Sequence, residues 1–135
     1  SVWVRPTTIV GDEREIFCTR SNATQSDVPI ELLLEIQQNG TLRFRLANTQ
    51  TSVTNFDIYS AASQMTVNTS HIITASVVGS TATLKKDGTI IASGTVSGTR
   101  SATNNVVMIG AQFAGAPFTN RFFIGQLDSF KIKKI

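Results

Sequence analysis

The chain has 135 residues, enough for one domain that buries roughly two-thirds of the surface of its unfolded form. Its net charge is +3, and the lysines and arginines are scattered rather than gathered in a basic stripe with aromatics, so we expect no nucleic-acid partner. No apolar run approaches the ~20 residues of a membrane span, and a single cysteine cannot form an intrachain disulfide.

The first elements of the chain are short strands. Residues 1–6 alternate, which places Val2 and Val4 on one face. A domain rarely starts inside a strand, so we expect residues 1–135 to be a single domain of a longer polypeptide, with an N-terminal strand missing. Residues 16–19 form the next short strand of the predicted pattern.

The next pattern is a hairpin of two alternating strands, residues 30–37 and 41–47. A two-residue loop would place apolar side chains opposite charged ones, so parity predicts a three-residue loop that ends in Gly40. This loop pairs Ile36 with Leu42 on the buried face. It also pairs Glu35 with Arg43 on the outer face, where an exposed ion pair sets register more than stability.

The clearest pattern is a meander of three antiparallel strands with two tight turns, residues 69–96. A two-residue loop at residues 79–80, with glycine where φ must be positive, puts the apolar residues of both flanking strands on one face. A three-residue loop at residues 86–88 then sets Leu84 against Ile90 and leaves Ile91 on the outer face. Both turns therefore predict the same buried face.

The remaining segments complete an all-β pattern. Residues 49–62 suggest a strand with a bulge, and residues 106–110 a short strand buried on both faces. Residues 122–135 close the chain as a strand with Phe130 and Ile132 directed inward. So long a strand needs a second partner, either residues upstream of the chain or another subunit of a homo-oligomer.

Six short motifs occur in an order typical of one family. They are, in chain order, Trp3 to Pro6, Ile16-Phe17, His71, Asp87-Gly88, Ile109-Gly110 and Phe123 to Asp128. This order resembles the laminin-G-like branch of the concanavalin A-like lectin-glucanase superfamily, although Ser70 stands where the family usually has Trp. The resemblance implies a two-sheet antiparallel jelly-roll sandwich with loops along one rim.

The resemblance also implies two functions from different classes. Members are mostly noncatalytic modules of extracellular, cell-surface or virion-surface proteins. The first hypothesis is a carbohydrate-binding or adhesion module of a larger surface or virion protein, with glycans as partners. The second is a structural or oligomerisation module of a viral tail, spike or capsid decoration, with other protein subunits as partners. A glycoside hydrolase is the third and least favoured hypothesis.

The hydrolase hypothesis rests on Glu31 and Glu35. Some glycosidases of this superfamily carry acids at the first, third and fifth positions of one strand, which share a face. Here the third position is Leu33, and Arg43 and Arg45 lie opposite. A glutamate beside an arginine is held ionised and cannot act as a proton donor. We therefore expect a solvated strand face, no catalytic residue and no enzyme activity.

The candidate ligand residues lie in the loop before the last strand. They are Phe113, Phe118, Asn120 and Arg121. Flat aromatic rings can stack on sugars while Asn and Arg supply hydrogen bonds. The alternative interpretation is that both phenylalanines cover the edge of the core or a subunit contact.

The other reactive residue types have structural explanations. His71 lacks a nearby Cys, His or acidic pair in the sequence, and Cys18 in a strand is a small buried hydrophobe. Four aspartates could contribute to the calcium site that some laminin-G-like modules carry: Asp12, Asp57, Asp87 and Asp128. They do not cluster at loop spacing, so we expect no metal site and no cofactor, with calcium as the alternative.

Overall fold

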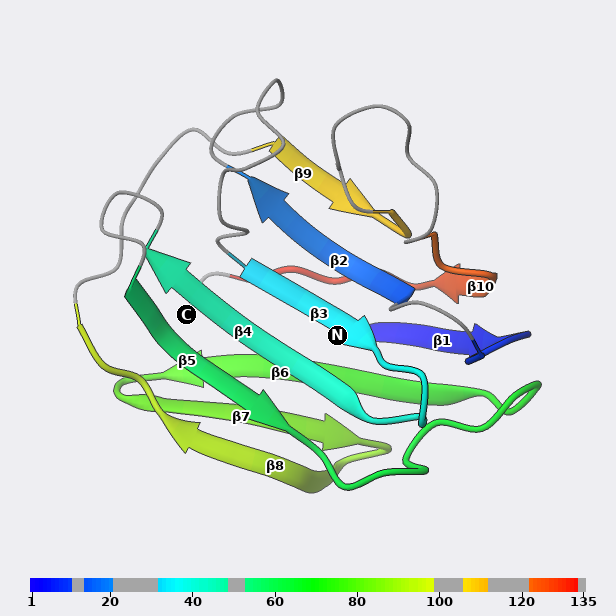
Figure 1. Cartoon of the computed structure of the whole chain (residues 1–135), viewed down its shortest axis with the longest axis horizontal. Coiled ribbons are helices and arrows are strands. Elements are labelled where there is room, and N and C mark those ends of the chain that lie inside the picture. Colours follow the sequence, from blue (N-terminus) through cyan, green and yellow to red (C-terminus); the bar gives the residue numbers. More distant parts are fainter. Residues whose placement is uncertain (11–13, 21–31, 49–52, 99–105, 112–121, 134–135) are drawn as a thin grey trace.

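Two antiparallel sheets of five strands each pack face to face and enclose the core (Figure 1). The structure is a computed structural model that describes residues 1–10, 14–20, 32–48, 53–98, 106–111 and 122–133. The β1 sheet contains, in spatial order, β10 (Gly125–Asp128), β1 (Val2–Pro6), β6 (His71–Val78), β7 (Thr81–Lys86) and β8 (Thr89–Thr95). The β3 sheet contains β5 (Val53–Tyr59), β4 (Leu42–Asn48), β3 (Leu32–Ile36), β2 (Arg14–Arg20) and β9 (Val106–Ile109). The predicted all-β jelly-roll sandwich is confirmed.

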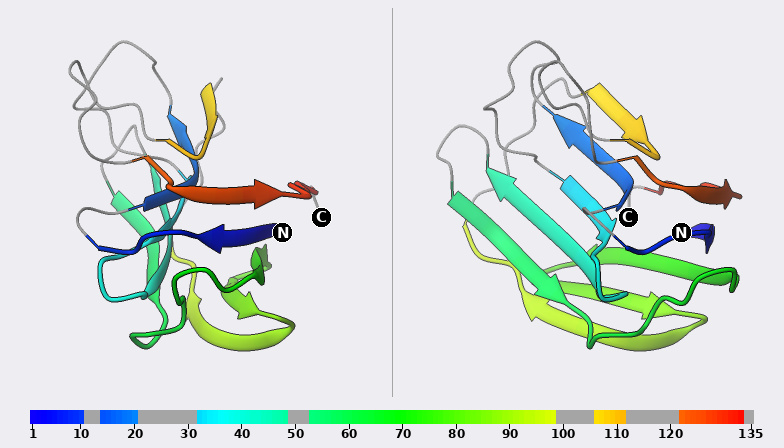
Figure 2. Two further views of the ribbon diagram at one scale, coloured as in Figure 1. Left: turned by 90° about the vertical axis from the view of Figure 1, so that its right-hand side faces the viewer. Right: turned by 45° about the vertical axis from the view of Figure 1, so that its right-hand side comes forward.

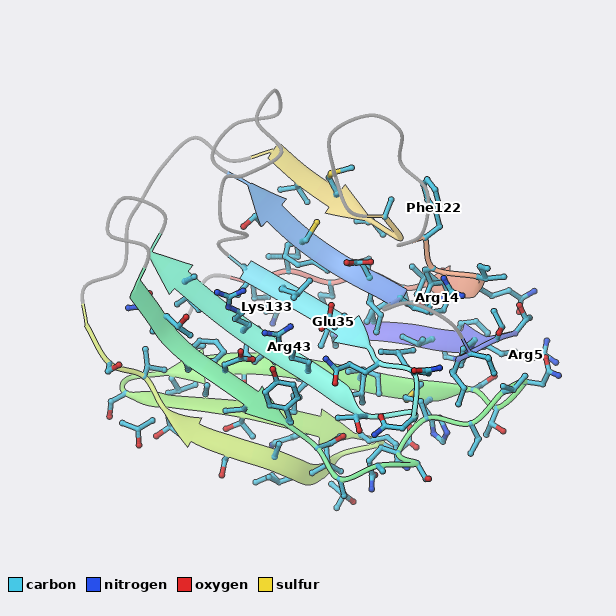
Figure 3. All side chains as sticks on the ribbon, in the orientation of Figure 1. Arg5, Arg14, Glu35, Arg43, Phe122 and Lys133 are labelled. Atoms are coloured by element: carbon cyan, nitrogen blue, oxygen red, sulfur yellow. The ribbon has the colours of Figure 1, made fainter. Side chains whose placement is uncertain are left out.

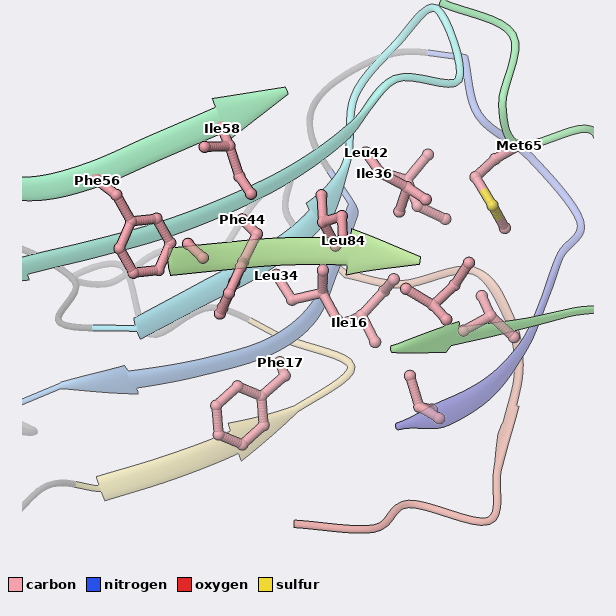
Figure 4. Close-up of a cluster of buried hydrophobic side chains, with 14 residues drawn as sticks. Ile16, Phe17, Leu34, Ile36, Leu42, Phe44, Phe56, Ile58, Met65 and Leu84 are labelled. Atoms are coloured by element: carbon pink, nitrogen blue, oxygen red, sulfur yellow. The ribbon is translucent and has the colours of Figure 1, made fainter. Parts of the chain in front are cut away.

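The core forms where the inner faces of the two sheets meet (Figure 4). Its fully buried members include Ile36 and Leu42 from the β3 sheet and Ile73 and Leu84 from the β1 sheet. Burying each such side chain contributes about 1.5–3 kcal/mol relative to leaving it in water. The two-residue alternation of the strands thus becomes one shared apolar layer.

The predicted registers of both hairpins are confirmed. Ile36 pairs with Leu42 across β3 and β4, and Ala75 pairs with Leu84 across β6 and β7. Parity selected the first pairing, and the two-residue turn at Gly79 and Ser80 selected the second. In either hairpin a slip by one residue would have turned the apolar side chains outward.

The second turn of the meander differs from its prediction. Asp87 and Gly88 form a two-residue loop with φ of 50° and 84°, rather than a three-residue loop. The extra residue is instead taken up by a bulge further along β8, in its pairing with β7. Ile90 therefore pairs with Lys85 and is 60% exposed, while Ile91 packs against the core.

β9 is not buried on both faces as predicted. It stands at the edge of the β3 sheet and pairs with β2 alone among the described strands. Val107 and Ile109 are consequently each 52% exposed. An apolar run at a sheet edge looks the same in sequence as one at a sheet centre.

The last strand is shorter than predicted. β10 pairs with β1 and ends at Asp128, and Ser129 follows with a φ of 53°. Phe130 still packs inward and stacks on Phe17 with 5.5 Å between ring centroids. Ile132, predicted to point inward, is 65% exposed.

The described part of the chain contains no helix long and apolar enough to cross a membrane.

Candidate functional site

The outer face of the β3 sheet carries a group of polar side chains that are neighbours across four strands (Figure 3). We call it the outer polar cluster, and its members are Glu15 on β2, Glu35 on β3, Arg43 on β4, and Asp57 and Tyr59 on β5. Glu15 pairs with Glu35, Glu35 with Arg43, and Arg43 with Tyr59. Strand alternation therefore aims all of these side chains away from the apolar core.

Arg43 lies at the centre of the cluster. Its Nε and Nη2 donate to the two carboxylate oxygens of Asp57 at 2.8 and 2.7 Å, and its Nη1 donates to Oε1 of Glu35 at 3.1 Å. The hydrogen bond to Asp57 is the largest of the effects that raise the pKa of Arg43 above its usual value. A two-pronged bond of this kind fixes both partners in orientation.

Tyr59 presents a flat ring beside this pair. The guanidinium carbon of Arg43 lies 5.2 Å from the ring centroid, and the hydroxyl donates to Asp57 at 3.2 Å. Partial burial raises the pKa of the Tyr59 phenol, which therefore stays neutral and keeps its proton for this bond. The residue is 47% exposed, so the ring is both held and accessible.

Glu15 and Glu35 stand side by side, and both are fully buried. Oε1 of Glu35 also accepts a hydrogen bond from Gln37 at 3.2 Å. The prediction of an Arg43 partner for Glu35 is confirmed, but the prediction of a solvated strand face there is wrong. Nearby Cys18 and Leu33 on the same outer face are buried as well, so this part of the sheet is covered rather than open to water.

The predicted ligand residues Phe113, Phe118, Asn120 and Arg121 lie outside the described residues, as does Glu31. The loop hypothesis therefore stays a prediction.

His71 and Cys18 have the structural surroundings that the sequence predicted. Nδ1 of His71 lies 2.7 Å from Oδ2 of Asp87, whose Oδ1 accepts the backbone N–H of Ile72 at 2.8 Å. That backbone bond, followed by the contact with His71, lowers the pKa of Asp87. These bonds fasten the second turn of the meander to the start of β6. Cys18 is buried in a small apolar cluster with Leu33.

The aspartates named as calcium candidates are dispersed. Asp57 binds Arg43, and Asp87 binds the start of β6. Asp128 accepts the backbone N–H of Ser129 at 2.6 Å. Within the described ranges no three His, Cys, Asp or Glu residues come together as a metal site. Asp12 lies outside those ranges.

Sequence reasoning missed the roles of Asp57 and Tyr59. Their i, i+2 spacing placed both on one strand face, which was the available signal. The pairing of β4 with β5 shifts at a bulge between Leu46 and Ala47, so their neighbours could not be derived by counting.

Comparison with known proteins identifies a family over almost the whole chain. The protein-family model described as the concanavalin A-like lectin/glucanases superfamily, of the laminin G type, matches residues 1–134. No curated protein and no solved structure matches the chain.

Proposed function

Because the chain belongs to the laminin-G-type family of the concanavalin A-like lectin/glucanases superfamily, we propose that it is a noncatalytic module that binds glycans or mediates adhesion. Domains of this family typically act outside the cell, as parts of larger surface proteins. The proposed ligand surface is the exposed edge of the outer polar cluster, formed by Tyr59 and Asp57.

The exposed ring of Tyr59 is the observation that carries this proposal. A flat ring fixed by Arg43 and Asp57 offers a stacking surface for a sugar without the entropic cost of ordering a free side chain. The side chain of Asp57 is 26% exposed, and its carboxylate is an acceptor for sugar hydroxyl groups.

The predicted loop residues form the other proposed part of this surface. Phe113, Phe118, Asn120 and Arg121 supply stacking and hydrogen-bonding groups of the same chemistry. A glycan that contacts both parts would lose affinity when either part is changed.

A glycan array, followed by calorimetry with the best ligand, tests the proposal. Tyr59→Ala should weaken binding roughly 2- to 12-fold, which corresponds to the 0.5–1.5 kcal/mol of an aromatic contact. Tyr59→Phe keeps the ring and should bind nearly as well as the parent chain. Ile90→Ala is the control, because Ile90 is a 60% exposed apolar residue on β8, in the other sheet. If Tyr59→Ala binds normally and Phe118→Ala does not, the ligand surface is the loop alone.

The noncatalytic assignment has its own test. Glu35 is fully buried and lies 3.1 Å from Arg43, so it lacks the exposure that a proton donor to a bound sugar needs. Glu31→Gln and Glu35→Gln should therefore leave any glycan-related activity intact. A large loss of sugar hydrolysis in either variant would identify a glycoside hydrolase instead.

A contact with other protein subunits is the second candidate function, and the exposed apolar edge near β9 and β10 favours it. Val107, Ile109, Phe122 and Ile124 are each about half exposed, and the N–H of Phe123 donates to the carbonyl of Gly110 at 2.9 Å, which brings the two segments together. An assembly such as a viral tail, spike or capsid decoration would bury such an edge. A monomeric mass in solution that Phe122→Asp leaves unchanged would count against self-association through this edge.

A further inference from the structure

The loop that joins β5 to β6 ends in five consecutive exposed residues, 66–70, which lie beside the end of β1 (Figure 1). The middle residue, Asn68, is fixed to β1 through its main chain. Its N–H donates to the carbonyl of Pro6 at 2.7 Å, and Nε of Arg5 donates to its carbonyl at 3.2 Å. The side chain of Asn68, in contrast, makes no hydrogen bond within the part of the chain that the structure describes. The main chain is therefore held while the amide group is free.

A β-turn presents Asn68 at the surface. The N–H of Thr69 donates to the carbonyl of Thr66 at 3.3 Å, and Asn68 occupies the third position of this turn with a φ of 61°. A positive φ at the third position favours glycine or asparagine. The turn thus explains why residue 68 is one of these two types, but it does not require any particular side chain two residues later.

Ser70, two residues after Asn68, completes an acceptor sequence for N-linked glycosylation. Residues 68–70 read Asn-Thr-Ser, which fits the pattern Asn-X-Ser/Thr in which the third residue carries a hydroxyl. Ser70 is exposed, and its hydroxyl bonds to none of the described residues. It also stands where the laminin-G-like pattern usually has Trp. A tryptophan there would leave no acceptor sequence, so this departure from the pattern creates it.

Two other Asn-X-Thr sequences occur in the chain, at Asn22 and Asn39. Asn22 lies outside the described residues. Asn39 lies in the loop of the first hairpin, where Gly40 is buried and Thr41 is only 6% exposed. In the folded protein an enzyme can therefore reach all three residues of the sequence at Asn68 but not all three of the sequence at Asn39.

We propose that Asn68 is a site of N-linked glycosylation in the exported protein. The proposal requires export, which is typical of this family, and it does not require the sugar-binding surface at Tyr59. The donor is an oligosaccharide joined to a lipid diphosphate. Nδ2 of Asn68 forms a bond to C1 of the first sugar and loses one proton. The bond between C1 and the phosphate oxygen breaks, and the lipid diphosphate leaves with that electron pair.

The place of Asn68 in the fold separates this glycan from the proposed ligand surface. Asn68 is bonded to the end of β1, in the β1 sheet, whereas Tyr59 and Asp57 lie on the outer face of the β3 sheet. A glycan is bulky and hydrated, and it belongs on an exposed loop of this kind. Glycosylation at Asn68 should therefore leave binding at Tyr59 intact.

Secretion of the chain from a eukaryotic cell, behind an added leader, tests the proposal. Peptide N-glycosidase in water labelled with heavy oxygen marks each asparagine that carried a glycan, and mass spectrometry of the peptides locates the mark. We expect the mark at Asn68 and its complete loss in Ser70→Ala. Thr69→Ala is the matched control, since it removes the neighbouring exposed hydroxyl but keeps the acceptor sequence, and it should retain the mark. A secreted chain with no mark at Asn68, or a mark there that survives Ser70→Ala, would overturn the proposal.

A second measurement tests accessibility without secretion. The purified, folded chain is treated with a soluble N-glycosyltransferase that transfers glucose from UDP-glucose to Asn-X-Ser/Thr sequences. We expect transfer to Asn68 in the folded chain, and transfer to Asn39 only after the chain has been cut into peptides. Equal transfer to both in the folded chain, or transfer to Asn39 alone, would overturn the proposal. Neither readout depends on sugar binding, so a normal ligand affinity of Tyr59→Ala would refute the ligand surface and leave this site unaffected.

Discussion

Gly94 on β8 lies against Ile58 on β5, where the two sheets are in contact at one edge of the sandwich. A Cβ atom on Gly94 would lie 2.5 Å from Cγ2 of Ile58 on β5, and Ile58 is only 8% exposed. Overpacking a core of this kind costs about 1–3 kcal/mol. The alanine recovers about 0.5–1 kcal/mol, since glycine in a strand loses more conformational freedom on folding. Gly94→Ala should therefore lower the free energy of unfolding by about 1 kcal/mol and at most about 2.5 kcal/mol.

Urea unfolding followed by the fluorescence of the single tryptophan, Trp3, measures this loss. Ile58→Ala alone should cost about 2–5 kcal/mol because it leaves a cavity. In the double variant the new methyl group at residue 94 enters that cavity. The loss of unfolding free energy in the double variant should therefore be smaller, by at least about 1 kcal/mol, than the sum of the losses in the two single variants.

Ser93→Ala is the control, since Ser93 is the exposed neighbour of Gly94 on the same strand and should change stability by less than about 0.5 kcal/mol. The reasoning is refuted if Gly94→Ala stabilises the protein. Strict additivity of the two substitutions would refute it as well, because it would mean that residues 58 and 94 do not touch.

Three further substitutions have defined outcomes. The hydrogen bond from the Ile72 N–H is the largest effect that lowers the pKa of Asp87 in the folded protein. The ionised Asp87 therefore stabilises the fold above pH 3.8, its usual pKa, and this stabilisation is lost as the pH falls through the lower folded pKa. In Asp87→Asn the free energy of unfolding, measured with urea, should depend less on pH below about pH 4. Gly125→Ala would place a Cβ atom against the backbone of Arg5 and should lower the free energy of unfolding by more than about 2 kcal/mol. Faster amide exchange along β10 would detect this loss. Leu84→Ala removes a fully buried side chain and should cost about 2–5 kcal/mol in the same urea assay; a loss under 1 kcal/mol would contradict its place in the core.

The sequence was most informative where a turn and an alternating pattern constrain each other. Around Gly40, parity left a single loop length that kept both Ile36 and Leu42 inward, and the structure has that register. Around Gly88 the same reasoning chose the wrong loop length. A bulge along β8 restores the inward position of Ala92 opposite Leu84, so two different turns satisfy the pattern equally well.

The candidate site was predicted less completely than the fold. The pairing of Glu35 with Arg43 followed from one hairpin, which is local in sequence. The bond from Arg43 to Asp57 joins β4 and β5, whose register depends on a bulge. No short sequence motif predicts the position of that bulge. The burial of Glu35 could not be predicted from its own hairpin either, because its neighbour Glu15 belongs to β2, outside that hairpin.

The pairing of Ser1 with Lys131 has a consequence for how the domain would respond to mechanical force. β1 and β10 lie side by side and run antiparallel (Figure 2), and Ser1 is bonded to Lys131 in the segment that follows β10. Tension applied at residues 1 and 133 would pull these neighbours apart sideways, so their hydrogen bonds would break one pair after another, as in a zipper, rather than together in shear. A domain loaded in this way would yield first by the separation of Ser1 and Val2 from the sheet, while the meander of β6, β7 and β8 stayed folded.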